Sequence, residues 1–353
     1  MSRNNNFDLI RLFAALQVVI LHAFGHFNIH NTNIITIIRE ILIHLPGVPI
    51  FFTISGFLIC MSYEKKNDNY KFYVNRFLRI YPGLWISFII TFLILLFFNF
   101  INSQTFHSYQ FFAWCITQLS FLQFYTPDFF RSFGVGTPNG SLWTIAVEVQ
   151  FYLLIPIIYN LFIKERPVIF FNTSLLILAI LSYIFFCIAK LATETFAIKL
   201  LNVSVIPYLF NFIFGILLYK NFVFILPYLK NKMLHWAVIY LTFIWIFSKY
   251  LNMYNHPLTP NVYGLIATLI LSILILSTSF SYTSVSKNWL KDFDFSYGIY
   301  IYHMLIINIF LELGFTGNII IAIFSICLSI CAGILSWILI EKKALQYKVA
   351  NIL

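Results

Sequence analysis

Residues 168–189 read VIFFNTSLLILAILSYIFFCIA, and no charged side chain occurs among them. About 20 mostly apolar residues are enough to cross the hydrocarbon core of a bilayer as a helix. Charged residues bound the stretch on both sides, with Lys164 and Arg166 before it and Lys190 after it. The stretch therefore predicts a transmembrane helix.

The composition of the whole chain agrees with this prediction. Of its 353 residues, 61% are hydrophobic, 20% are aromatic and only 10% are charged. Soluble proteins have about 25% charged residues, so a water-facing surface of the usual kind cannot be built from this chain. Secreted disulfide scaffolds, disordered tails and nucleic-acid-binding domains are excluded, and no nucleic acid partner is expected. The lipid bilayer is the expected surrounding.

Blocks of similar length and hydrophobicity recur along the chain. They predict an all-α, polytopic transmembrane bundle of about ten spanning helices, with residues 1–353 forming a single transmembrane domain. The longest stretch outside the spans, about 102–141, is rich in turn-forming Gly and Pro, so no additional soluble domain is expected. The predicted spans are 8–29, 45–63, 77–101, 142–163, 168–189, 199–220, 233–251, 261–280, 296–313 and 317–340.

The distribution of Lys and Arg decides the status of a further apolar stretch, 109–125. With ten spans and a cytoplasmic N-terminus, 16 Lys and Arg lie in the inner loops and 5 in the outer loops. If 109–125 also crossed the membrane, the split would become 10 against 11. Because cytoplasmic loops carry an excess of Lys and Arg, the ten-span arrangement with both termini cytoplasmic is favoured. Residues 109–125 are then expected at the outer interface.

The cysteines indicate no metal site. All five lie in apolar segments, and although Cys327 and Cys331 share a helix face, no His or further Cys completes a set of ligands. We interpret them as small hydrophobic residues, and no bound metal or cofactor is expected.

The first predicted span contains three residues that lipid disfavours, Asp8, Arg11 and His22. Arg11 and His22 are separated by 11 positions, which places them on one helix face about 16 Å apart. Ala14 and Val18 lie between them on the same face, and small residues allow close approach of a helix or a slender ligand. A satisfied interfacial histidine is the alternative, but the shared face with Arg11 favours a functional site.

The fourth predicted span carries Glu148, which lies about 10 Å below its outer end. His22 reaches a similar depth in the first span. A carboxylate can orient a histidine and support its protonated form. The pair is therefore a candidate catalytic unit, and the alternative is a structural pair that joins two helices.

Arg76 and Arg79 lie three residues apart at the predicted cytoplasmic end of the third span. Their spacing suits a phosphate site, because a guanidinium can donate two parallel hydrogen bonds to phosphate oxygens. Contact with anionic lipid headgroups is the alternative. The composition alone does not separate the two.

The same segments resemble the membrane-bound acyltransferase-3 family, which includes O-acetyltransferases of bacterial surface polysaccharides. The resemblance is carried by five segments in order: Arg11-x-x-Ala14-x-x-x-Val18-x-x-x-His22, residues 47–58 (GVPIFFTISGFL), Arg76-x-x-Arg79-Ile-Tyr-Pro82, residues 141–156 (SLWTIAVEVQFYLLIP), and Ser296-Tyr297-x-Ile-Tyr300-x-x-His303.

The resemblance implies an acyltransferase of the bacterial cytoplasmic (inner) membrane. Its donor substrate would be acyl-CoA, usually acetyl-CoA, and its acceptor a hydroxyl of a carbohydrate or lipid-linked glycan. Some relatives carry an extracytoplasmic hydrolase-like domain. This chain is expected to acylate its acceptor directly or to pass the group to a separate extracytoplasmic transferase.

The resemblance and the residues together assign roles to the candidate site. His22 would act as general base or acyl carrier with Glu148 as its partner, and Arg11, Arg76 and Arg79 would bind the phosphates of CoA. Supporting roles are expected for Asp8, Ser141, Trp143, Gln150, Tyr152, Tyr297, Tyr300 and His303.

A transporter or flippase of a small molecule or lipid-linked sugar is the competing class, because ionisable residues inside a membrane also mark transport paths. The sequence contains no internal repeat relating its two halves, which disfavours that class. A purely structural scaffold leaves the cost of the buried ionisable residues unexplained.

The charge distribution predicts that position 66 faces the cytoplasm and position 318 faces the outside. The measurement is labelling of Lys66→Cys and Asn318→Cys in intact cells with a membrane-impermeant maleimide, after the five native cysteines are replaced by alanine. Only Asn318→Cys should react before the cells are opened. Reaction at both positions in intact cells would rule out the ten-span arrangement.

Overall fold

The computed structural model describes residues 5–29, 33–66, 68–252, 259–291 and 293–348, and these ranges contain helices and turns but no β-strand. The all-α prediction is confirmed. The chain divides into two compact units, each assembled from three segments. The first consists of Met1–Ala14, Ile43–Asn69 and Val147–Phe293, and the second of Ala15–Leu42, Tyr70–Ala146 and Asp294–Leu353.

The first unit holds the beginning of α1 (Phe7–His26), most of α7 (Trp143–Ile158) and eight further α-helices in the described chain. These are α3 (Gly47–Lys66), α8 (Val168–Leu191), α9 (Phe196–Asn202), α10 (Leu209–Lys220), α11 (Phe222–Leu229), α12 (Met233–Ile244), α13 (Val262–Ser279) and α14 (Ser284–Leu290), with the short elements η3 (Tyr159–Ile163), η4 (Ile206–Tyr208) and η5 (Trp245–Tyr250).

The second unit holds the remainder of α1 and the helices that surround α15 (Ser296–Glu312). The others are α2 (Asn33–Ile43), α4 (Asn69–Phe97), α5 (Ser103–Phe106), α6 (Tyr109–Leu119), α16 (Ile319–Ser336) and α17 (Lys342–Leu345), with the short elements η1 (Asp128–Phe130), η2 (Gly140–Leu142) and η6 (Trp337–Glu341).

Two glycines allow a close helix contact in the first unit, between α3 and α10. A Cβ atom built on Gly56 would lie 2.0 Å from the carbonyl oxygen of Phe212, and one on Gly215 would lie 2.1 Å from that of Thr53. In lipid, helices associate mainly through close packing, which small residues permit. The ring of Phe52 stacks on Phe212 at 4.5 Å beside this contact. The glycines therefore hold the two backbones in contact.

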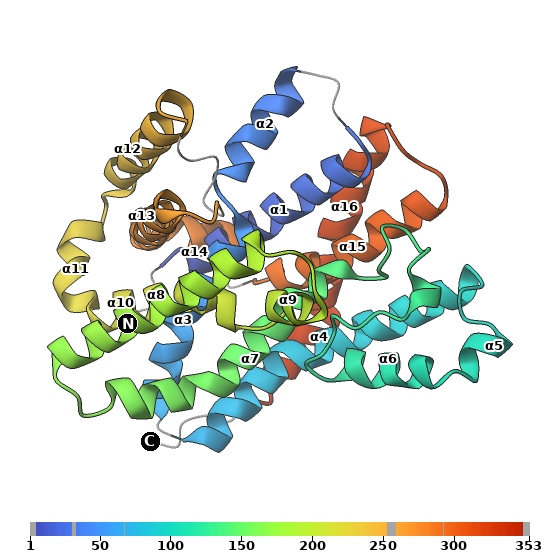
Figure 1. The fold of residues 1–353 in the computed structure, drawn as a ribbon, viewed down its shortest axis with the longest axis horizontal. Helices are drawn as coiled ribbons and strands as arrows, with labels where there is room; N and C mark the ends of the chain where they lie inside the picture. Colours follow the sequence, from blue (N-terminus) through green and yellow to red (C-terminus); the bar gives the residue numbers. More distant parts are fainter. Residues whose placement is uncertain (1–4, 30–32, 67, 253–258, 292, 349–353) are drawn as a thin grey trace. The chain divides into compact units, whose positions relative to one another are not determined.

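The second unit is built around α15, in which every residue from Ser296 to Asn308 is buried. α15 and α16 lie side by side in Figure 1. They approach closely at Gly333, where a Cβ atom would lie 2.4 Å from the side chain of Ile299. On another side Tyr297 donates a hydrogen bond to the carbonyl of Ile80 in α4 at 2.8 Å. A helix buried on all sides is a core element.

The stretch 102–141 forms a folded segment of the second unit. Its longest helix, α6, has 11 residues and is too short to cross a bilayer. Trp114 of α6 is buried against Phe88 and Phe130. Further along, Asn308 of α15 accepts a hydrogen bond from Val135 and donates two to the carbonyls of residues 137 and 138. The prediction that 109–125 does not span is confirmed.

The described chain contains eight helices that are long and apolar enough to cross a membrane. Phe196–Asn202 together with Ile206–Lys220 makes a ninth if this pair, bent by 47°, counts as one span. The ninth predicted span, 296–313, corresponds to α15, whose 17 residues are at the short end of what crosses hydrocarbon. The predicted number of about ten is therefore reduced to eight or nine by length and composition.

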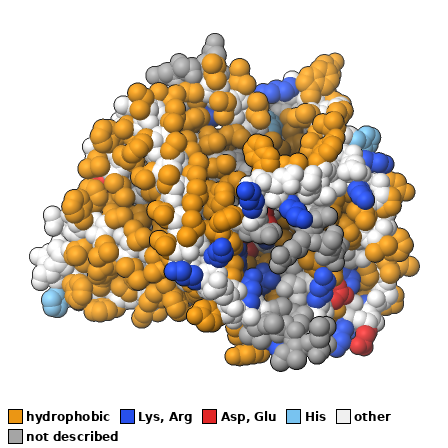
Figure 2. All heavy atoms as spheres, turned by 180° about the vertical axis from the view of Figure 1, so that it is seen from behind, with side chains coloured by type: hydrophobic (Ala, Val, Ile, Leu, Met, Phe, Trp, Pro, Cys, Tyr) orange, Lys and Arg blue, Asp and Glu red, His pale blue; other side chains and the backbone are white. Residues whose placement is uncertain are grey.

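These helices expose many apolar side chains on the surface of the protein. On α8, Ile177, Ile180, Leu181 and Ile184 are each about half exposed, and hydrophobic side chains cover most of the face seen in Figure 2. Such a surface is unsuited to water and suited to lipid tails. The chain is thus a multi-pass membrane protein.

The contact between α3 and α10 predicts a large loss of stability when Gly215 gains a methyl group. Gly215→Ala should unfold at a lower temperature in detergent, because overpacking costs about 1–3 kcal/mol and the neighbouring atom is backbone. The matched control is Gly25→Ala in α1, where an added Cβ meets nothing within 4 Å. Equal unfolding temperatures for the two variants would contradict the packing argument.

Candidate functional site

The polar side chains predicted to be functional fall into two groups, one in each unit. His22, Arg76, Arg79, Ser141, Trp143, Tyr297, Tyr300 and His303 belong to the second unit, and Asp8, Arg11, Glu148, Gln150 and Tyr152 belong to the first.

His22 and His303 are in direct contact in the second unit. Nδ1 of His22 lies 2.9 Å from Nε2 of His303, and the rings stack with centroids 5.2 Å apart. His303 is fully buried, and its other nitrogen, Nδ1, lies 2.6 Å from the backbone oxygen of Tyr300. His22 is only partly buried. The ring of His26, one turn further along α1, lies 5.6 Å from that of His22.

Tyr300 links the same helix to the start of α7. Its hydroxyl and that of Thr144 lie within hydrogen-bond distance at 2.8 Å, and Tyr300 also reaches the backbone oxygen of Ser141 at 3.4 Å. The hydroxyl of Ser141 donates to Asn139, whose amide group donates to the carbonyl of Ile301. These bonds fix the helix turn that carries His303. Trp143, the first residue of α7, is partly buried.

Arg79 is held by two carboxylates that the sequence interpretation overlooked. Its guanidinium lies 2.5 Å from Oδ2 of Asp294 and 4.0 Å from Oε2 of Glu341. Glu341 is 2% exposed and accepts a hydrogen bond from Ser336. Counting only Lys and Arg for topology hid these acids, although Glu341 stands at the end of a strongly apolar block. Arg79 therefore joins α4 to both ends of the C-terminal segment.

Arg76 differs from Arg79 in its surroundings. Its guanidinium lies 5.6 Å from the centre of the Phe72 ring, one turn earlier in α4. A guanidinium over an aromatic face is a favourable but modest interaction. Arg79, by contrast, lies beside both Asp294 and Glu341.

Glu148 accepts two hydrogen bonds in the first unit. The hydroxyls of Ser55 and Tyr152 both donate to Oε1, at 2.9 and 2.6 Å. Tyr152 lies one turn further along α7, while Ser55 comes from α3, next to Gly56. Hydroxyl donors support a carboxylate in a place where water is scarce. Ser55 lay within the second motif but was not predicted as a site residue.

Gln150 supports the broken span rather than a ligand. Its amide nitrogen donates to the carbonyl of Val203, and its oxygen accepts from the backbone nitrogen of Val205. These are the residues between α9 and η4, where the chain bends by 47°. Backbone groups freed by such a break need partners inside a membrane.

Arg11 forms an ion pair with Asp8 one turn earlier in α1, at 3.4 Å. Both side chains are partly exposed, at 21% and 40%. Exposed pairs contribute little to stability, so the effect of this contact is mainly to orient Arg11. The predicted apolar face of α1 is buried, with Ala14 at 0% and Val18 at 7%.

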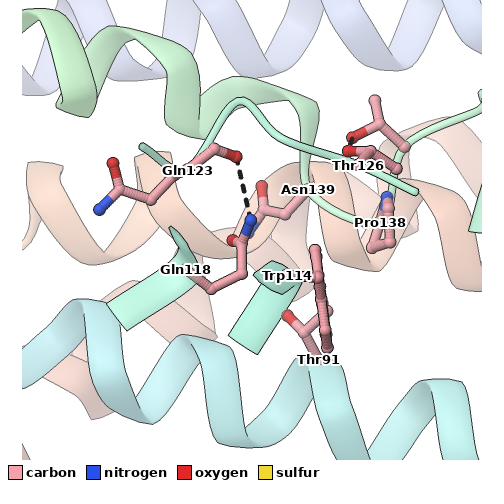
Figure 3. Close-up of a pocket in the computed structure, with 8 residues that line it drawn as sticks. Thr91, Trp114, Gln118, Gln123, Thr126, Pro138 and Asn139 are labelled. Carbon is pink, nitrogen blue, oxygen red and sulfur yellow. Dashed lines mark hydrogen bonds between the residues drawn. The ribbon is translucent and has the colours of Figure 1, made fainter. Parts of the chain in front are cut away.

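A small polar pocket lies in the 102–141 segment of the second unit (Figure 3). It has room for about one water molecule, so it is too small for a sugar ring. Gln118 reaches across it to the backbone of Gln123. It is lined by Thr91, Trp114, Gln118, Gln123, Thr126, Thr137, Pro138 and Asn139. The described residues contain no group of His, Cys, Asp and Glu that could hold a metal ion.

Comparison with known proteins assigns the chain to a family. Residues 4–339 match the acyltransferase domain of the acyltransferase-3 family. Nodulation protein 10 of Rhizobium leguminosarum bv. viciae is 29% identical over 98% of this chain and 94% of its own length. The peptidoglycan O-acetyltransferase OatA of Listeria monocytogenes is 28% identical over 33% of this chain and 20% of its own length.

A further relative is the acyltransferase MdmB of Streptomyces mycarofaciens, which is 28% identical over 45% of this chain and 40% of its own length. No solved structure matches the chain. The family match covers nearly all of the helical bundle, including α1 with His22 and α15 with His303. The protein is therefore a multi-pass membrane protein that belongs to the acyltransferase-3 family.

Proposed function

We propose that the protein transfers an acyl group, in the first instance acetyl, from acyl-CoA on the cytoplasmic side to a hydroxyl of a carbohydrate or cell-surface glycan. The observation that carries the proposal is the contact of His22 with the buried His303 inside a bundle of this family. The relative OatA is named as a peptidoglycan O-acetyltransferase, which favours a glycan acceptor. We further infer that the protein resides in the bacterial cytoplasmic membrane.

The reaction needs a base and an orienting environment, and no cofactor. The acceptor hydroxyl loses its proton to a ring nitrogen of His22 while its oxygen attacks the thioester carbon. The C–S bond breaks, and the proton passes from His22 to the sulfur, which leaves as CoA thiol. If His22 carries the acyl group instead, the same nitrogen attacks the thioester first and the acceptor oxygen displaces it afterwards.

Glu148 is proposed as the second reactive group. Its Oε1 accepts both hydroxyl bonds of its unit, so Oε2 is the atom left to act on a partner. Because His303 occupies Nδ1 of His22, a carboxylate would have to act at the other ring nitrogen or on the acceptor. The pairing of Glu148 with His22 remains a prediction.

The donor site is proposed at the arginines. Arg11, Arg76 and Arg79 are the candidates for the phosphates of CoA, and Asp294 and Glu341 orient the guanidinium of Arg79. Guanidinium groups suit this task because they match phosphate oxygens geometrically.

An assay in detergent, where no membrane separates two compartments, distinguishes the transporter hypothesis from this proposal. Purified protein in detergent is incubated with radiolabelled acetyl-CoA and a soluble glycan fragment, and transfer is followed over time. An acyltransferase releases CoA and labels the acceptor, whereas a transporter consumes no thioester. Release of CoA without labelled glycan would indicate that a separate extracytoplasmic transferase completes the reaction.

Replacing His22 tests the catalytic assignment. His22→Ala should lower turnover by about 10²–10⁴-fold, because general-base catalysis typically contributes that much. The control is His107→Ala, since His107 is exposed and belongs to the 102–141 segment. Normal turnover by purified His22→Ala protein would show that His22 is neither the general base nor the acyl carrier.

Glu148→Gln keeps the shape of the side chain and removes its charge, so it should also lose most activity. If Glu148 and His22 act as one unit, the double variant should be little slower than His22→Ala alone, because coupled catalytic residues are not additive. Losses that multiply would mean that Glu148 acts separately, on the acceptor.

The two arginines of α4 should respond differently to substitution. Arg76→Ala should raise the apparent KM for acetyl-CoA, because a guanidinium that contacts the CoA phosphates is lost. Arg79→Ala should lower the unfolding temperature, because removing one partner of a buried ion pair costs up to about 3–5 kcal/mol and Asp294 and Glu341 would lose their cation. If Arg76→Ala and the native protein have the same KM for acetyl-CoA, Arg76 does not bind CoA and serves only lipid contact or membrane topology.

A further inference from the structure

The proton on His303 can be located from its contacts. Nδ1 of His303 lies 2.6 Å from the backbone oxygen of Tyr300. A carbonyl oxygen only accepts hydrogen bonds, so Nδ1 carries a hydrogen. A neutral imidazole has one N–H, and its second nitrogen is then an acceptor. Nε2 of His303 is that acceptor.

The neutral form of His303 follows from its position in the fold. The ring is fully buried within α15, and its polar contacts in the described chain are His22 and its own helix backbone. An imidazolium buried without a carboxylate is costly. His22 must therefore supply the hydrogen in the 2.9 Å contact, from its Nδ1.

We propose that His303 is a positioning residue that holds His22 in the tautomer with hydrogen on Nδ1, so that Nε2 of His22 is the reacting atom. The inference rests on the proposed function, in which His22 is base or acyl carrier. Nε2 of His22 makes no hydrogen bond in the described part of the chain. Its lone pair is available in a ring that is only partly buried.

His303 keeps its own proton throughout the reaction. When Nε2 of His22 takes the proton of the acceptor hydroxyl, His22 becomes an imidazolium that still donates from Nδ1 to Nε2 of His303. That bond shortens and strengthens because its donor is now charged. When the proton moves on to the departing sulfur of CoA, His22 returns to its starting tautomer. The histidine pair thus supports the charge without a buried carboxylate.

Two substitutions separate positioning from simple packing. His303→Gln places an amide oxygen near the former Nε2 and can still accept from His22. His303→Asn places its amide group near the former Nδ1, so it can still donate to the carbonyl of Tyr300 but leaves no acceptor for His22. The two variants differ in which of the two hydrogen bonds survives, and the asparagine side chain is shorter by one methylene group.

The asparagine variant should lose about 10²-fold in kcat with the KM for acetyl-CoA unchanged, because a misplaced catalytic group costs about that much. The glutamine variant should stay within about tenfold of the native protein, which corresponds to one hydrogen bond. Equal activity of the two, or the reverse order, would overturn the inference. Activity of His22→Ala would instead overturn the proposed function itself.

Ring-nitrogen NMR of histidine-labelled protein gives a test that needs no active variant of His303. Signals of His22 are assigned by their loss in His22→Ala. The native protein should show a protonated Nδ1 and an unprotonated Nε2 for His22, and a protonated Nδ1 for His303. A protonated Nε2 on neutral His22 would refute the tautomer even if both substitutions at position 303 prevent folding.

Discussion

The second unit is organised around a single constraint, the burial of α15 on every side. Lipid and close-packed side chains offer no hydrogen bonds, so each polar group on such a helix needs a partner from another element. Tyr297 bonds to α4, Tyr300 to the start of α7, His303 to α1, and Asn308 to the loop before η2. The polar residues thereby specify which elements surround the helix and at what height.

The same constraint separates structural from reactive polar residues. Asn308 and Gln150 each use both ends of their amide groups on backbone partners, so they have little left to offer a substrate. His22 and Glu148 differ, because one polar atom of each, Nε2 and Oε2, makes no hydrogen bond in the described chain. Unused hydrogen-bonding capacity inside a membrane is costly, and a substrate that uses it recovers that cost.

Features that depend on residues close together in the sequence could be predicted, whereas features that depend on distant residues could not. The helical bundle could be predicted because hydropathy is a local property of about 20 residues, and α6 was correctly excluded by its length and the loop charges. The broken span was not anticipated, because residues 199–220 read as one apolar block. Pro207 lies at the start of η4, and Gln150 bonds to the backbone between α9 and η4.

The candidate site was predictable only in part, because its contacts are distant in sequence. The face shared by Arg11 and His22 follows from helical periodicity, whereas His22 and His303 are 281 positions apart and nothing local joins them. The carboxylates around Arg79 were missed for another reason: topology depends on Lys and Arg, and acidic residues contribute little to it. A search for acids at the ends of apolar blocks would have found Glu341.

A histidine rather than a carboxylate beside His22 makes physical sense in this environment. A carboxylate at the centre of a helix in lipid costs about 2.5–3.5 kcal/mol, and Glu148 has two hydroxyl donors to support it. A neutral ring costs less and accepts one directed hydrogen bond. Because the backbone oxygen of Tyr300 fixes the orientation of that ring, His303 orients His22 without adding a formal charge. The pair therefore favours a base that takes a proton from the acceptor and releases it to sulfur within one reaction cycle.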